Sequence, residues 1–102
     1  MQIEDAVALI RSAVEGHDGR WADLGAGRGT FTRALARILN AESTIVAVDR
    51  DSDALAEIAS WAKAEAPNVT TARGDFTETL VLPENPGAFD GMLLANALHF
   101  VK

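Results

Sequence analysis

The 102-residue sequence contains no cysteine, which excludes disulfide bonds and thiolate chemistry and leaves the redox compartment undetermined. Long apolar runs are also absent, and no segment approaches the roughly 20 apolar residues that span a bilayer. The first residues, MQIEDAVALIRS, carry acids early and include no basic segment. We therefore predict no signal peptide, no membrane partner and a cytoplasmic location.

Basic residues are the minority among the charged ones: nine lysines and arginines stand against 15 acids, for a net charge of −6. A nucleic-acid surface needs a basic stripe that displaces counterions from the phosphates. We therefore predict that the chain binds no nucleic acid, while a cationic ligand remains compatible with its charge. The length and the apolar share of 48% predict one globular domain over residues 1–102.

Periodicity and turn residues divide the chain into alternating helices and strands. We predict helices over 3–15, over 29–39 and from Asp51 or Ser52 to Pro67, and strands over 21–24, 44–48, 69–72 and roughly 89–95. Strands that alternate with helices indicate an α/β domain with a parallel sheet and right-handed crossovers.

The most informative segment is RWADLGAGRGTFTRALARIL, residues 20–39. It places Gly25, Gly27 and Gly29 at alternate positions between a predicted strand and a predicted helix. Because glycine has no Cβ, a ligand can lie directly on the backbone of such a loop. The segment is typical of a nucleotide-type cofactor loop, and a tight turn without a ligand is the alternative interpretation.

A dinucleotide site is the less favoured interpretation of this loop. It requires the spacing G-x-G-x-x-G, with the pyrophosphate at the helix N-terminus. Here Thr30 stands where the last glycine is needed, and Asp23 precedes Gly25 by two residues. A carboxylate at that position would face a pyrophosphate poorly but would suit an ammonium group. S-adenosylmethionine carries an ammonium and a sulfonium and has no phosphate.

The segment WADLGAGRGTFTRALA resembles the first motif of the class I S-adenosylmethionine-dependent methyltransferases. The segments VAVDRD (46–51), RGDFTE (73–78) and FDGMLLANALHFV (89–101) resemble the family motifs that follow the second, third and fourth strands. All four lie at carboxyl ends of predicted strands, where open parallel sheets bind ligands. The resemblance implies a three-layer Rossmann-like fold with strand order 3-2-1-4 and S-adenosylmethionine as cofactor.

The resemblance also implies roles for the glycine loop. Gly25, Gly27 and Gly29 would lie against the methionine part of the cofactor. Asp23 would lie near the amino group of that methionine part.

The later motifs supply the remaining predicted contacts, again by resemblance. Asp49 would accept hydrogen bonds from both ribose hydroxyls, since a carboxylate has two acceptor oxygens. Arg50 would lie over the adenine, Asp75 would accept from the adenine amino group, and the backbone N–H of Phe76 would meet the ring edge. Asn96 would contact the methionine part.

Several of these residues have a structural alternative. Asp49 could be a helix-capping acid, and Asp75 could be an Asx-turn residue. We expect Asp90, at the start of the fourth strand, to be structural. His99 is the only histidine near the predicted site. We expect it to pack against apolar neighbours, and it is a weak candidate for a catalytic base or substrate contact.

The resemblance covers nearly the whole chain but only the cofactor-binding half of the family domain. The family sheet has seven strands, and the sequence ends shortly after the fourth. We therefore expect the isolated chain to bind the cofactor with little or no turnover, as a truncated methyltransferase fold. A non-catalytic module is the alternative. Any methyl acceptor is expected to be a small molecule, because the acidic balance disfavours nucleic acid.

In the order 3-2-1-4 the fourth strand lies at an edge of the sheet. The strand is apolar, and its only charge is Asp90 near its start. Unpaired backbone groups on such a strand can pair with another chain, and two-fold dimers are the commonest closed assembly. We therefore predict a homodimer through residues 89–101.

Overall fold

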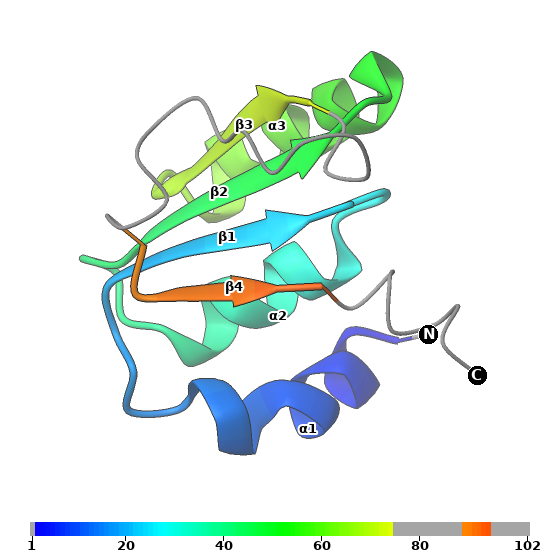
Figure 1. Ribbon diagram of the computed structural model, residues 1–102. Helices are drawn as coiled ribbons and strands as arrows, with labels where there is room; N and C mark the ends of the chain where they lie inside the picture. Colours follow the sequence, from blue (N-terminus) through cyan, green and yellow to red (C-terminus); the bar gives the residue numbers. More distant parts are fainter. Residues whose placement is uncertain (1, 75–88, 95–102) are drawn as a thin grey trace.

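The computed structural model describes residues 2–74 and 89–94. Its elements are α1 (Ile3–Val14), β1 (Arg20–Leu24), α2 (Thr30–Ile38), β2 (Thr44–Asp49), α3 (Ser52–Glu65), β3 (Val69–Arg73) and β4 (Gly91–Leu93). The strands form one parallel sheet in the order β3-β2-β1-β4 (Figure 1). The predicted α/β class and strand order are confirmed.

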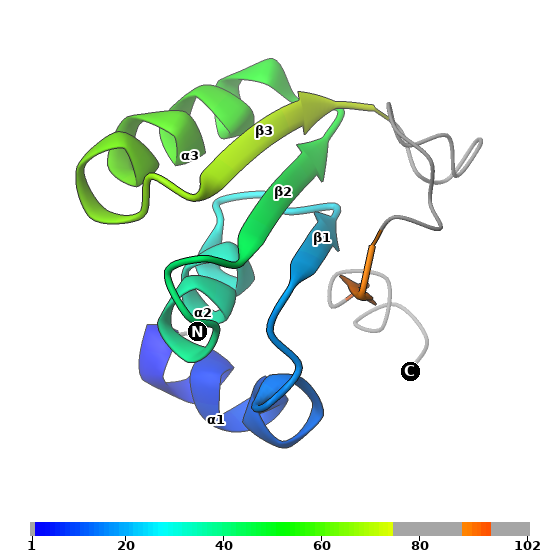
Figure 2. The same cartoon turned by 90° about the vertical axis from the view of Figure 1, so that its left-hand side faces the viewer.

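The three helices lie on one side of the sheet (Figure 2). Their apolar faces pack on the strand residues of that side, which include Trp21, Ile45, Ala47 and Val69. Because successive strand residues point to opposite faces, the neighbouring positions form a second cluster of Ala22, Leu24, Val46 and Val48. Of the three layers that the resemblance implies, the described residues form two, the helices and the sheet.

The helices follow the periodicity of the sequence. Ala6, Ile10 and Val14 recur at four-residue spacing and are buried on α1, which contacts α2. Helical periodicity also predicts burial of Ala13 and Ala59, and both are exposed. Each lies beside a buried residue, Val14 on α1 and Ile58 on α3, at the border of the apolar face of its helix.

The fourth strand begins later than the sequence predicts, at Gly91 rather than Phe89. Asp90, the residue before the strand, is bonded to the start of β1. Its carboxylate Oδ2 accepts from the Arg20 N–H at 2.8 Å, and its own N–H donates to the Arg20 carbonyl at 2.7 Å. The structural role predicted for Asp90 is confirmed, since it joins the start of β4 to the start of β1. Ala95, the predicted end of the strand, lies outside the described residues.

Candidate functional site

The loops after β1 and β3 are both attached to the carboxyl end of β2. The N–H groups of Gly25 and Ala26 donate to the Val48 carbonyl at 2.8 and 2.9 Å, and the Gly74 N–H donates to the Asp49 carbonyl at 3.0 Å. The end of β2 is therefore the centre of this edge of the sheet. Ligands of open parallel sheets bind at such an edge.

The glycine loop has a backbone that other residues rarely adopt. Gly25, Gly27 and Gly29 have φ values of +75°, +56° and +86°, in the left-handed region. Gly29 is also tightly packed: a Cβ there would lie 2.8 Å from Cγ1 of Ile58 and 3.2 Å from Cζ2 of Trp61. As the N-cap of α2, Gly29 provides no side-chain hydrogen bond to the first turn of that helix. The helix N-terminus therefore reaches the edge without a side-chain cap.

Asp49 connects the glycine loop to the start of α3. Its Oδ2 accepts from the Gly27 N–H at 2.8 Å, and its Oδ1 accepts from the Asp51 N–H at 2.8 Å. The cap of α3 is Asp51, whose carboxylate accepts from the N–H groups of Asp53 and Ala54. The helix-cap alternative for Asp49 is therefore wrong. Each carboxylate oxygen has two lone pairs, so both oxygens of Asp49 can accept a further hydrogen bond.

Asp23 occupies a different environment, two residues before the loop. Its side chain is only 2% exposed, and the hydroxyl of the fully buried Thr32 donates to its Oδ2 at 2.7 Å. Burial raises the pKa of the Asp23 carboxyl from 3.8 to about 6; the Thr32 hydrogen bond opposes this rise, and the negative charge of Asp49 adds to it. Thr32 is not among the site residues predicted from the sequence. The signal that could have identified it is a hydroxyl residue on the buried side of α2, which it shares with Leu35.

The structure brings Asp23, the glycine loop and Asp49 to one edge, with Arg50 following β2. Arg50 is exposed, and its carbonyl accepts from Nε of Arg73 at 3.2 Å. The ligand roles assigned to these residues stay predictions. Four further predicted residues lie outside the described part of the chain: Asp75, Phe76, Asn96 and His99.

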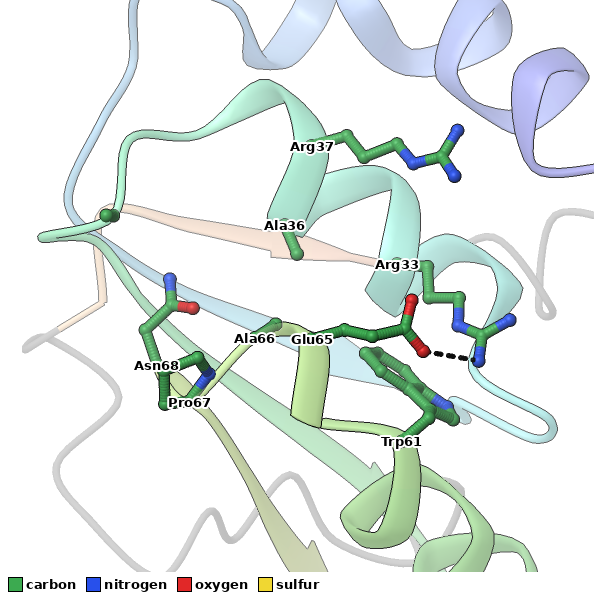
Figure 3. Close-up of a pocket in the computed structure, with 9 residues that line it drawn as sticks. Arg33, Ala36, Arg37, Trp61, Glu65, Ala66, Pro67 and Asn68 are labelled. Atoms are coloured by element: carbon green, nitrogen blue, oxygen red, sulfur yellow. Dashed lines mark hydrogen bonds and ion pairs between the residues drawn. The ribbon is translucent and has the colours of Figure 1, made fainter. Parts of the chain in front are cut away.

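A cavity of about 290 Å³ lies between α2 and α3 (Figure 3). The guanidinium of Arg33 lies 4.5 Å from the ring centroid of Trp61, and its Nη2 lies 3.2 Å from Oε2 of Glu65. None of the described residues predicted to bind the cofactor lines this cavity. Its polar wall is a contact between two helices, so we place the candidate site at the sheet edge instead.

Two features are absent from residues 2–74 and 89–94. No three histidine, cysteine, aspartate or glutamate residues of this part are grouped so as to hold a metal ion. No helix in this part is both long enough and apolar enough to cross a membrane.

Sequence comparison matches residues 22–102 to a family model described as a methyltransferase domain. The chain is also similar to the ribosomal RNA small subunit methyltransferase H of Chromohalobacter salexigens. The two are 38% identical over 77 residues, which cover 72% of this chain and 22% of that protein. The chain therefore spans less than a quarter of this relative.

Structure comparison finds the same fold in larger proteins. The YcgJ protein of Bacillus subtilis matches with a TM-score of 0.70 and 21% identity, over 87% of this chain and 36% of that one. TomG, an O-methyltransferase of Streptomyces achromogenes that takes part in tomaymycin synthesis, was solved in complex with SAM. It matches with a TM-score of 0.62 and 21% identity, over 83% of this chain and 38% of that one. At these identities the matches establish the fold alone.

Proposed function

We propose that this chain, which belongs to the methyltransferase domain family, binds S-adenosylmethionine at the carboxyl edge of β1 and β2. The position of Asp49 is the observation that carries the proposal. Its two carboxylate oxygens each accept one backbone N–H, from Gly27 and Asp51. Both keep capacity for one more donor. A vicinal diol such as that of a ribose offers two such donors.

In this proposal, the glycine loop binds the methionine part of the same ligand. Its left-handed glycines keep side chains away from the backbone that follows β1. The first-turn N–H groups of α2 favour a negative charge, as helix N-termini do, and the methionine carboxylate would supply one. Asp23 would meet the ammonium. Bound there, the cofactor supplies a methyl group on a sulfonium, whose transfer depends mainly on alignment with the acceptor.

A dinucleotide would also place a ribose on Asp49, so the choice of ligand depends on the rest of the loop. Thr30 occupies the position of the third glycine of the dinucleotide pattern and begins α2. Asp23 is a buried acid beside the loop. An ionised carboxylate there opposes a pyrophosphate and favours an ammonium. Both observations support S-adenosylmethionine over NAD.

We propose a small molecule as the methyl acceptor. The similar protein of Chromohalobacter salexigens is a ribosomal RNA methyltransferase by name. RNA is therefore the alternative acceptor. The excess of 15 acids over nine bases supports the small molecule, because RNA binding depends on phosphate neutralisation. Retention of RNA by the chain at physiological salt would contradict this assignment.

Calorimetric titration with S-adenosylhomocysteine tests the proposed cofactor site. S-adenosylhomocysteine should bind, while NAD at the same concentration should give no heat of binding. A folded chain that binds NAD and not S-adenosylhomocysteine would overturn the proposal. Circular dichroism of the same sample establishes that the chain is folded.

A further inference from the structure

A buried polar pair flanks the glycine loop on its inner side. Asp23 lies on β1 before the loop, and Thr32 lies in the first turn of α2 after it. The two side chains are 2% and 0% exposed, and the Thr32 hydroxyl donates to Oδ2 of Asp23 at 2.7 Å. The pair therefore joins the two elements between which the loop is held.

We propose that Thr32 is a positioning residue, whose hydroxyl holds the Asp23 carboxylate so that Oδ1 accepts from the ammonium of the bound ligand. The inference rests on the proposed function. The hydroxyl engages Oδ2, while Oδ1 receives no hydrogen bond from the described residues. The carboxylate is thus fixed through one oxygen and keeps the other for a donor.

Packing alone does not account for this pair. A buried hydroxyl and carboxylate can be replaced by apolar groups of the same shape with little effect on stability, or with a gain. A buried ionised carboxylate is costly unless it is paired. Asp23 is also affected by the charge of Asp49. This charge is negative, so it makes the ionised form of Asp23 less favourable. A cationic ligand group would supply the missing partner.

Two matched variants and two ligands test the role of Thr32. Thr32→Val removes the hydroxyl and keeps the shape, and Thr32→Ser keeps the hydroxyl. S-adenosylhomocysteine carries the ammonium, and 5′-methylthioadenosine has the adenosine and the sulfur but lacks both the ammonium and the carboxylate. Thr32→Val should lower the affinity for S-adenosylhomocysteine about tenfold, the usual effect of losing a hydrogen bond to a charged group. Thr32→Val should change the affinity for 5′-methylthioadenosine less than about twofold. Thr32→Ser should bind both ligands with the affinity of the unmodified chain.

A double-mutant cycle with Asp23→Asn provides the second test. If Thr32 acts through Asp23, adding Thr32→Val to Asp23→Asn should change the affinity for S-adenosylhomocysteine less than about twofold. An equal loss of both ligands in Thr32→Val, or no loss of either, would overturn the inference and leave the proposed function standing. If the unmodified chain binds neither ligand, both fail together.

Discussion

The carboxyl ends of β1 and β2 lie side by side in the sheet, yet their acids occupy opposite environments. Asp23 lies inside β1, is 2% exposed and is bonded by a side-chain hydroxyl. Asp49 ends β2, is only partly buried and is bonded by two backbone N–H groups. The pKa of the Asp23 carboxyl is raised to about 6 by burial.

This difference gives the proposed ligand site two acids of different kinds. Asp49 stays hydrated in part and is oriented by the backbone of two loops, so it can accept further donors without a large desolvation cost. Asp23 is kept away from water at the expense of stability, because burial disfavours its charged form. In the proposed site, the ammonium of the ligand would offset this cost.

The largest expected effect concerns the stability cost of Asp23. A raised pKa means that the folded chain binds this proton more tightly than the unfolded one, so the contribution of Asp23 to stability is most favourable at low pH. Stability then falls as the pH rises from 3.8 to about 6. The difference between these pKa values corresponds to about 3 kcal/mol above pH 6. The stability of Asp23→Asn relative to the unmodified chain should therefore rise by about 2.5 kcal/mol between pH 4 and pH 7.5, because a small part of the loss has already occurred at pH 4.

Urea unfolding at both pH values measures this gain. Asp53→Asn is the control, because Asp53 is an exposed acid in the first turn of α3. This variant keeps Asp23 and should therefore lose stability between pH 4 and pH 7.5 as the unmodified chain does. The stability difference between Asp23→Asn and the unmodified chain could instead be the same at both pH values. That result would contradict the raised pKa of the Asp23 carboxyl.

The next effect concerns ligand affinity at the end of β2. Asp49→Ala should lose hydrogen bonds worth about 1.5–3 kcal/mol, which is roughly a 10- to 150-fold weaker affinity for S-adenosylmethionine. Asp51→Ala is the matched control from the same loop. It should lose about 1 kcal/mol of stability as a helix cap and keep its affinity. Equal affinities of the unmodified chain and a folded Asp49→Ala variant would refute the ribose assignment.

A smaller effect tests how the glycine loop is held on α3. Gly16 and Gly29 have nearly the same φ, +85° and +86°, but only Gly29 has close neighbours where a Cβ would be. Gly16→Ala should lose about 1 kcal/mol, from the left-handed backbone alone. Gly29→Ala should lose about 1–2 kcal/mol more, because the added methyl group would clash with Ile58 and Trp61. Thermal unfolding measures both losses of stability. Equal losses would show that α3 shifts to accommodate the methyl group.

The smallest effect on stability is expected at β4, the other neighbour of β1. Among the described residues β4 pairs only with β1, and Met92 and Leu94 are 39% and 38% exposed. We propose that this edge forms the homodimer predicted for residues 89–101. Leu94→Lys should change the stability by less than about 1 kcal/mol and should give a monomer. Leu93→Lys is less suitable, because Leu93 packs against the helix-side core.

Light scattering of the unmodified chain at tens of micromolar measures the assembly directly. The expected mass is that of two chains, and Leu94→Lys should halve it. A monomeric mass for the unmodified chain would contradict the homodimer.

The order of the elements and the position of the site follow from the sequence alone. Helical periodicity, β-branched runs and the glycines between them are local features, and each element except β4 begins within one residue of where these features place it. Asp49 follows its strand directly in the sequence, so its location at the sheet edge is predictable. The ligand roles of these residues come from the family resemblance.

Only the tertiary structure decided which side chains meet. The Thr32–Asp23 bond joins residues nine positions apart across the glycine loop, and the bond from the Gly27 N–H to Asp49 joins residues 22 apart. The bond from Arg20 to Asp90 spans 70 residues and joins the start of β1 to the residue before β4. No local pattern specifies such pairs. They depend on how the helices pack on the sheet and which strands become neighbours, and these are properties of the whole folded chain.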